Sequence, residues 1–495
     1  MAGVEELSRE ELVSLLVAQA GTIAAQKETI ASQAEIVEEL RRRVAELERR
    51  LSRNSGNSSV PPSADDALPG RTGPARRAAG AEKGKRGKRK GADGSSLAWS
   101  EDPDETVSHY PLGACGCGAD LGGAAEVGLA RSHQVHEVPL VTVRVVQHDL
   151  YRVRCGCGRE HVAGQPGGVA RAPASYGPNL LALVVYLLVF QHVPVERAAL
   201  LVRDVTGAAP STGFVHGVLA RAAAAVAGTV ERIKELVVGS PVVGFDETTL
   251  RCGPAGTKKY VLSASTDLYV VFGLGGRDLA SFTAFGVLGG FVGTAVHDRY
   301  NLYDHADFAQ VGGHQLCVAH ILRDLEDVAE VYPDSHWPGQ AQRALRGLVR
   351  AWHTARDAGR ARVPAEAAGP LTAEFRGAVR VGLSEVPPAE GPAATTKQPP
   401  GRSLLECLRD REDDVLRFCS DTRVWPTNNI SERDLRPQKT QQKVSGRLTS
   451  EDVTRHRLDL RTYVATARKH GMNVMAVLRD AMAGTPWTPP AAASP

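Results

Sequence analysis

Apolar residues recur every seven positions through the first part of the chain. One position of the repeat is held by Leu16, Ile23, Ile30, Val37, Val44 and Leu51, and a second by Leu12, Leu40 and Leu47, with interruptions at Gln26 and Gln33. Glu and Arg residues flank this seam, as in coiled coils. The pattern predicts a coiled coil over residues 1–52 through which the chain forms a homo-oligomer. A single long helix packed on its own chain is the alternative.

The periodicity ends at Asn54-Ser55-Gly56-Asn57, and residues 53–98 are rich in Ser, Pro, Gly and basic residues. Such a composition predicts a disordered linker. Nine Lys or Arg stand between Arg71 and Lys90 against one acid, Glu82. This is either a solvated tail or a sequence-independent contact with nucleic-acid phosphates. The candidate DNA-binding residues here are Lys85, Arg86, Lys88, Arg89 and Lys90.

The apolar pattern turns helical over residues 171–237. Leu180 to Val189 is apolar, Pro194 can open a second helix that Gly207 ends, and Pro210 to Phe214 resembles a cap that starts a third helix, running to about Ile233. Three short helices with a glycine-containing turn are compatible with a helix-turn-helix DNA-binding domain. A small helical bundle of another kind would show the same pattern.

Strand patterns follow. Short apolar runs predict strands over Val242–Leu250, Lys259–Ser265 and Tyr269–Leu274, a helix over Phe282–Leu288, and a strand from Phe291 that ends at His297-Asp298. Three antiparallel strands, a helix and a fourth strand is the ribonuclease-H-like order. His314 to Ala329 then reads as a helix, and residues 332–423 read as a helical insertion. Glu432 follows on a helix expected to be capped by Asn428, Asn429 and Ser431.

Length and composition narrow the class of protein. A chain of 495 residues needs several domains. No run of 18 or more uncharged apolar residues occurs, so we expect no membrane span. The acidic, amphipathic N-terminus has no signal-peptide pattern, so we expect a cytoplasmic protein. Eight cysteines in so long a chain are not a disulfide framework, and in a reducing compartment paired cysteines favour a metal.

Four of these cysteines form two glycine-flanked pairs, Cys115-Gly-Cys117 and Cys155-Gly-Cys157. Four thiolates suit a tetrahedral structural zinc site, because glycine lets each pair turn tightly around the ion. We expect a zinc ribbon over residues 99–170, with two strands between Val135 and Val153. Four thiols without metal are the alternative, and a histidine could replace one ligand: His109, His133, His136 or His161.

Three acids carry the catalytic hypothesis. Asp246 lies on or at the end of a buried strand, Asp298 closes another apolar run, and Glu432 lies in the segment TNNISERDLRP. Three carboxylates are what two-metal phosphoryl chemistry needs, since Mg²⁺ takes oxygen ligands. Asp246 would bridge the two ions, and Asp298 and Glu432 would complete one each. The alternative for Asp246 is a solvated acid in a turn.

The motifs GFDET, HDRYNLYDHA, HQLCVAHILRDLED and TNNISERDLRPQKTQQKVSGR resemble the DDE transposases of the bacterial insertion sequence 66 family. The resemblance implies DNA cleavage and strand transfer by an acidic triad of Asp246, Asp298 and Glu432 with two Mg²⁺ or Mn²⁺ ions. It implies DNA partners, namely transposon terminal inverted repeats and target DNA, and small accessory proteins of the same element. Cys317 and His320 match a C-x-x-H element of such proteins; we interpret them as a buried pair that packs a helix. The cysteine pairs depart from the family's commoner C-x-x-C.

The resemblance also draws attention to basic residues around the acids. DNA backbone contacts are expected from Arg433, Arg436, Lys439, Lys443 and Arg447, although a solvated basic helix would look the same. His297 and Arg299 flank Asp298 and could orient a phosphate. Two other classes stay open: a DNA-binding regulator with a silent catalytic fold, and a structural coiled-coil zinc protein.

The sequence as a whole therefore predicts a multidomain chain of the α+β or α/β class. Its expected domains are a coiled coil (1–52), a linker (53–98), a zinc ribbon (99–170), a helical domain (171–237), a ribonuclease-H-like catalytic domain (238–331 and 424–482), a helical insertion (332–423) and a tail (483–495).

Overall fold

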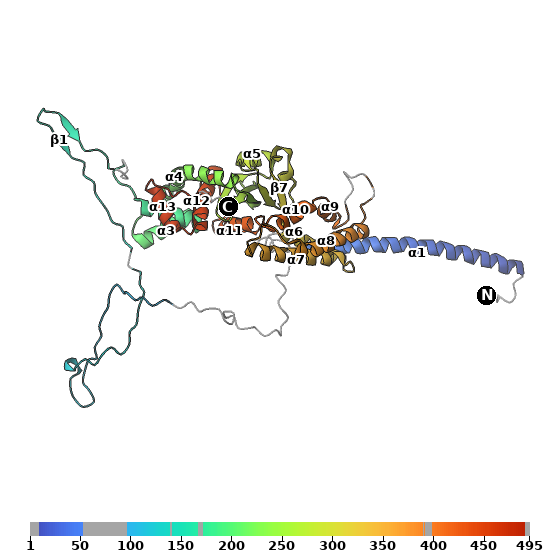
Figure 1. Cartoon of the computed structure of the whole chain (residues 1–495), viewed down its shortest axis with the longest axis horizontal. Coiled ribbons are helices and arrows are strands. Elements are labelled where there is room, and N and C mark those ends of the chain that lie inside the picture. The colour runs from blue at the N-terminus through green and yellow to red at the C-terminus, as the bar shows by residue number, and fades with distance from the viewer. Residues whose placement is uncertain are drawn as a thin grey trace. The chain divides into compact units, whose positions relative to one another are not determined.

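The computed structural model describes residues 9–52, 97–138, 141–166, 172–389, 391 and 398–490 (Figure 1). The chain divides into two compact units. The larger comprises residues 1–73, 147–204 and 208–495, and the smaller comprises residues 74–146 and 205–207. The basic stretch predicted to contact DNA, with Lys85, Arg86, Lys88, Arg89 and Lys90, lies outside the described residues.

Helices and strands alternate along the chain, and the fold belongs to a mixed α/β class. The described α-helices are α1 (Arg9–Ser52), α2 (Pro178–Val185), α3 (Val195–Thr206), α4 (Thr212–Val238), α5 (Leu279–Phe285), α6 (Val318–Val331), α7 (Trp337–Asp357), α8 (Ala365–Glu385), α9 (Arg402–Asp410), α10 (Glu412–Ser420), α11 (Asn429–Val444), α12 (Glu451–Lys469) and α13 (Val474–Met482). A π-helical segment, η4 (Tyr186–Phe190), continues α2, and short 3-10 turns are η3 (Leu121–Gly123), η5 (Leu288–Gly290), η6 (Asn301–Asp304) and η7 (Ala306–Phe308).

A five-stranded sheet has the order β5-β4-β3-β6-β7. Its strands are β3 (Val242–Leu250), β4 (Lys259–Ser265), β5 (Val270–Gly275), β6 (Thr294–His297) and β7 (Gly313–Leu316). The strands β3, β4 and β5 pair antiparallel, whereas β6 runs parallel to both β3 and β7. The three predicted antiparallel strands, the helix after them and the strand that precedes Asp298 are all present.

Successive side chains of these strands point to opposite faces of the sheet and pack into two different hydrophobic cores. On one face Phe245, Leu262 and Val271 pack with Ile233 and other residues from the end of α4. On the other face the core contains Leu250, Val261, Phe272, Leu435 of α11 and Leu458 of α12. Because side chains alternate along a strand, burying both faces requires apolar residues at nearly every position. This accounts for the continuous apolar character of β4 and β5.

The helices α7 to α10 lie between the second and third predicted acids and share one core. Trp337 and Leu345 of α7, Phe375 of α8, Leu405 of α9 and Phe418 of α10 are all buried in it. The same core includes Val296 of β6, Leu316 of β7 and Leu325 of α6. These helices therefore rest on the parallel edge of the sheet, and the chain returns from them to α11, which carries Glu432.

Two sequence predictions about elements are wrong. The segment His314–Ala329 is not one helix, because β7 takes Gly313–Leu316 and α6 begins only at Val318. His314 and Leu316 pair in register with Ala295 and His297 of β6, so the unpaired edge of β6 overrides the helical pattern.

The predicted ribbon between Val135 and Val153 is also displaced. Its two strands are β1 (Arg152–Arg154) and β2 (Glu160–Val162), which flank the second cysteine pair, so only β1 lies between the two pairs in the sequence. Ion pairs from Arg152 and Arg154 to Glu160, at 3.0 and 2.8 Å, join the two strands.

The three predicted helices before the sheet are present, as α2 with its continuation η4, α3 and α4. The predicted cap of the third is confirmed, because the Ser211 hydroxyl accepts a hydrogen bond from the Phe214 N–H. The third helix ends at Val238, later than predicted. α4 is 27 residues long, and its buried residues share a core with Leu460, Tyr463 and Val464 of α12 and with α13. By length and composition α4 is the one described helix that could cross a membrane. Its buried apolar residues pack against the rest of this unit, as expected for a core helix.

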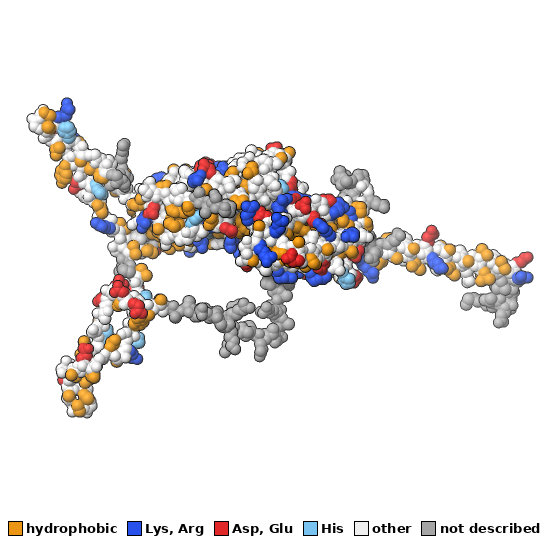
Figure 2. Space-filling view, viewed as in Figure 1, with side chains coloured by type: hydrophobic (Ala, Val, Ile, Leu, Met, Phe, Trp, Pro, Cys, Tyr) orange, Lys and Arg blue, Asp and Glu red, His pale blue; other side chains and the backbone are white. Residues whose placement is uncertain are grey.

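The helix α1 presents its heptad seam to solvent within this single chain. Leu16, Ile23, Ile30 and Leu40 are each more than half exposed, at 63, 52, 64 and 53%. Apolar side chains (orange) are visible along this helix in Figure 2. The helix is confirmed, and its self-association stays a prediction.

Candidate active site

Asp246 lies in the middle of β3, directly beyond the residues that pair with β6. The parallel pairing ends at Gly244 opposite Val296, and Asp298 follows the last residue of β6. The carboxyl ends of parallel strands meet at one edge of a sheet. Asp246 and Asp298 therefore reach the same edge although they are far apart in the sequence. The backbone N–H groups of Glu247 and Tyr300 each donate a 2.9 Å hydrogen bond to Asp246 and Asp298 respectively.

Glu432 reaches this edge from the first turn of α11. The start of that helix is attached to β3, because the side-chain amide of Asn428 donates a 2.6 Å hydrogen bond to the carbonyl of Phe245. Asn428 is the N-cap residue of α11, as predicted, but its side chain makes no capping bond to the helix and is used on β3 instead. Gly244 permits the close approach: a Cβ there would lie 2.5 Å from Ser431 Oγ and 2.7 Å from Asn428 Oδ1.

The charges of the neighbouring acids act on Asp246. Removal from water raises the pKa of Asp246 well above its ordinary value, and the negative charges of Glu247, Asp298 and Glu432 raise it further. Like charges held close together disfavour ionisation. A divalent cation would relieve the repulsion, and carboxylate oxygens are the donors that Mg²⁺ prefers. Magnesium binding at this edge stays a prediction, because among the described residues the three acids are not a group whose ligand atoms all lie within 4.8 Å of one another.

Glu247 is a member of this cluster that the sequence analysis did not single out. Its side chain is only 2% exposed, and it accepts hydrogen bonds from Arg277 Nε at 2.6 Å and from the Tyr303 hydroxyl at 2.8 Å. Arg277 also reaches Asp298 at 3.5 Å and lies over the Tyr300 ring. The adjacent acids in GFDET were a visible signal for Glu247, whereas nothing in the sequence marked Arg277.

Basic groups also stand beside Glu432. Arg323 Nη2 lies 3.5 Å and His320 Nε2 lies 3.9 Å from its Oε1 atom. Burial lowers the pKa of His320 to about 4, so the ring is neutral at pH 7. Cys317 is buried, and its sulfur accepts a hydrogen bond from the Asn428 backbone N–H. In the described part of the chain these two residues belong to no group of three metal-ligating side chains, in keeping with a packing role.

Comparison with known proteins identifies this chain. The profile of the transposase IS66 family matches residues 173–455, a span that contains the sheet, the helices α7 to α10 and all three acids. The chain belongs to the transposase IS66 family. A family of unknown function, DUF6444, matches residues 9–97. No curated protein matches the chain.

In this transposase-family chain the predicted DNA-contacting residues of α11 differ in their surroundings. Arg433, Arg436 and Lys443 are exposed. Lys439 is half-buried near Asp246 and Glu432, and burial lowers its pKa although the two acids oppose that shift. Arg447 donates a 2.8 Å hydrogen bond to the carbonyl of Pro254 and thereby ties the end of the helix to the loop after β3. Of these five residues, three therefore remain candidates for contact with DNA: Arg433, Arg436 and Lys443.

His297 and Arg299, the two basic residues beside Asp298, both make contacts within the protein. His297 is fully buried, so the expectation that it orients a phosphate is wrong. Its Nδ1 atom contacts the Asp298 carbonyl, and its Nε2 atom lies 3.0 Å from His314 Nδ1. Arg299 pairs with Asp324 of α6.

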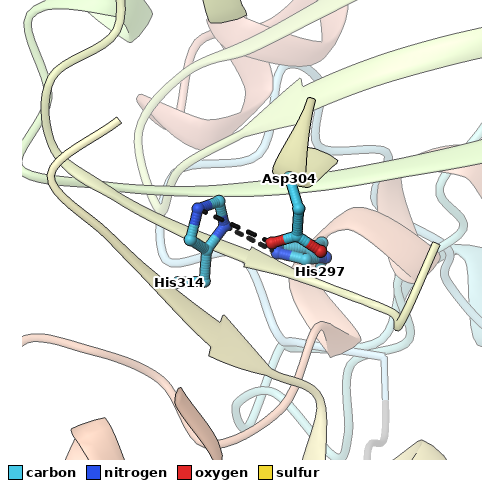
Figure 3. A group of neighbouring side chains, drawn as sticks. All are labelled: His297, Asp304 and His314. Carbon is cyan, nitrogen blue, oxygen red and sulfur yellow. Dashed lines mark hydrogen bonds and ion pairs between the residues drawn. The ribbon is translucent and has the colours of Figure 1, made fainter. Parts of the chain in front are cut away.

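His297, His314 and Asp304 form a second cluster (Figure 3). Their ligand atoms lie within 4.8 Å of one another, which would allow a metal ion. Both oxygens of Asp304, however, accept hydrogen bonds from Arg411, at 2.7 and 2.8 Å. The Asp298 carbonyl and the two imidazoles form a chain of hydrogen bonds. These bonds explain why the two histidines lie together without a metal ion. We read the cluster as a support that holds the end of β6.

The two cysteine pairs lie in different units. In the first, Gly118 N donates to Cys115 O at 2.7 Å and Cys115 N to Ala119 O at 2.8 Å. In the second, Gly158 N donates to Cys155 O and Cys155 N to Arg159 O, both at 2.8 Å. Gly118 and Gly158 both have positive φ, which favours glycine. All four cysteines are exposed. The two turns are alike, and their zinc binding stays a prediction.

Proposed function

We propose that this IS66-family protein catalyses metal-dependent cleavage and strand transfer of the DNA of an insertion sequence. Asp246, Asp298 and Glu432 would be the catalytic acids. The observation that carries the proposal is geometric: Asp246 on β3 and Asp298 directly after β6 lie beyond the parallel pairing of the two strands, and the Asn428 side chain holds the start of α11, with Glu432 in its first turn, against β3. Acids with perturbed pKa values that meet at one edge of a sheet are candidates for a functional site.

The three acids would hold two Mg²⁺ or Mn²⁺ ions. Such ions supply activation of the attacking oxygen and stabilisation of the charge that develops on the phosphate. Other side chains of the protein would hold the acids in position for this chemistry. Arg277 neutralises Glu247 and orients Asp298, and the Asn428 amide holds the first turn of α11 against β3.

The fold supports the same assignment. A sheet with three antiparallel strands followed by parallel strands, with acids beside β3 and β6, is the arrangement expected of a ribonuclease-H-like catalytic core. We assign residues 238–331 and 424–482 to that core and the helices between them to an insertion. The DNA partners would be the terminal inverted repeats of the element and its target DNA, and small accessory proteins of the same element could assist.

A catalytically silent DNA-binding regulator is the alternative, and one experiment separates the two. The purified chain is incubated with duplex DNA that carries the inverted repeat found beside its gene, with and without Mg²⁺. The proposal expects nicking at the repeat end that EDTA abolishes. Specific binding of the repeat with no cleavage in Mg²⁺ or Mn²⁺ would favour the regulator. Loss of both specific binding and cleavage would favour a purely structural coiled-coil protein.

A further inference from the structure

Two arginines of α12 are buried without an acidic partner. Arg457 and Arg461 stand one helical turn apart and are only 8 and 6% exposed. Arg457 Nη1 donates a 2.7 Å hydrogen bond to the carbonyl of Leu188, and Arg461 lies over the ring of Phe190. Among the described residues neither guanidinium forms an ion pair, and the Nε atom of each has no hydrogen-bond partner. Buried charges are expensive unless they are neutralised by a partner.

The two guanidiniums line one small cavity together with Gln438 and Gln441 of α11. The Nε2 atom of Gln438 has no partner in the described structure either, so three of the residues that line the cavity carry a buried N–H donor without a partner. The negative charge of Asp434 on α11 acts on Arg461, but Asp434 already forms an ion pair with Lys469 at 2.6 Å. One acceptor, Gln441 Oε1, also lacks a partner in this region.

The protonation states leave a net positive charge in this cavity. Burial lowers the pKa of Arg457 and of Arg461 to about 10, so both stay charged at pH 7. His192, which also lines the cavity, has a pKa lowered to about 4 by burial and by the two arginines, and it is neutral at that pH. The cavity volume is about 10 Å³, the space that a single water-sized occupant needs.

We propose that this cavity binds one monatomic anion, of the size of chloride, between Arg457, Arg461 and Gln438. Inorganic phosphate and a DNA phosphate are too large for the cavity. The anion would join three elements: α12, α11 and the segment after η4, whose His192 carbonyl accepts a hydrogen bond from Ser445. Since α11 also carries Glu432, the site would stabilise the helix that completes the acidic cluster.

The test is the thermal unfolding of the full chain in sodium chloride and in sodium gluconate at matched ionic strength. A ligand that binds only the folded state raises the midpoint with its concentration. We expect chloride, and bromide equally, to raise the midpoint by a few degrees with saturation, while gluconate does not. In crystals grown with bromide, anomalous scattering should show a peak between the two guanidiniums and Gln438.

The variant Gln438→Glu places a carboxylate at the cavity and keeps the side-chain size. It should lose the chloride dependence and have a higher midpoint in gluconate. Gln340→Glu, on α7, is the matched control and should keep the full chloride dependence. Equal midpoints in chloride and gluconate together with no bromide peak would show a water-filled cavity and overturn the proposal. A chloride effect that persists in Gln438→Glu would assign it to another site and also overturn it.

Discussion

The side-chain amide of Asn428 donates a hydrogen bond to the backbone carbonyl of Phe245, 183 residues earlier in the chain. This bond joins the N-terminus of α11 to β3 one residue before Asp246. It also determines where Glu432 lies, because Glu432 is in the first turn of the same helix.

Asn428→Ala should destabilise the protein and reduce DNA cleavage. The carbonyl of Phe245 would lose a buried partner, which costs roughly 1–3 kcal/mol of unfolding free energy. Chemical denaturation measures the stability and a nicking assay the activity. Asn429→Ala is the control, because Asn429 is exposed and should change neither quantity. A variant at Asn428 with wild-type stability and cleavage would show that the bond does not position α11.

Gly244→Ala should destabilise the protein by roughly 1–3 kcal/mol, as expected for overpacking of a close contact. The new Cβ would meet Ser431 and Asn428 at distances of 2.5 and 2.7 Å. Gly217→Ala in α4 is the matched control, since a Cβ there has nothing within 4 Å. The control should be neutral or more stable by up to about 1 kcal/mol because alanine favours a helix. Equal unfolding midpoints for the two variants would contradict the close approach of α11 to β3.

Glu432→Gln should abolish strand cleavage and leave DNA binding intact. Glutamine keeps the size of the side chain but loses the negative charge that would hold a cation. The loss of one electrostatic contact at a reacting centre costs on the order of 10²–10³ in rate. DNA affinity should persist, because it comes from Lys and Arg contacts with phosphates. Nicking is measured in Mg²⁺ beside a gel-shift titration at fixed salt.

The control for that variant is Glu374→Gln on α8, a carboxylate that is 36% exposed and remote in the fold from the three acids. It should leave nicking and binding unchanged. Near-normal nicking by Glu432→Gln would remove Glu432 from the active site. Loss of binding as well as nicking would mean that Glu432 supports the fold of α11.

Replacing Ile23 and Ile30 together by lysine should lower the oligomeric state. Both residues are more than half exposed in the single chain, and a coiled coil would bury them in its seam. The matched control replaces Ala25 and Ser32 by lysine, which adds the same charge on another face of the same helix. Light scattering gives the mass. If the seam variant keeps the mass of the parent, α1 does not mediate assembly.

Zinc should copurify at one ion per chain and be lost in Cys155→Ser. The two cysteine turns are alike, and four thiolates make a closed tetrahedral site. Cys407→Ser, a half-buried cysteine on α9, is the control and should keep its zinc. Elemental analysis of freshly purified, reduced protein measures the content. Wild-type zinc in Cys155→Ser, or none in the parent, would contradict a site made by these cysteines.

The sequence by itself determined the helices and strands whose apolar residues recur periodically or form a continuous run. The strands at Val242–Leu250 and Lys259–Ser265 and the helix carrying Glu432 follow from periodicity and apolar runs. It also supplied Asp246 and Asp298, because a carboxylate that follows an apolar run is visible without coordinates, whereas Glu432 was found through the resemblance of its motif to the transposase family. The helical pattern at His314 failed, since pairing with β6 outweighs local propensity.

Only the tertiary structure decided which polar groups share a site. Arg277 and Glu247 are 30 residues apart, and Asn428 and Phe245 are 183 apart. No local pattern specifies contacts across such distances in the chain. The same holds for the burial of Arg457 and Arg461. They are buried because α12 packs against the sheet on one side and against α4 on the other, a choice made by the whole core and not by the helix.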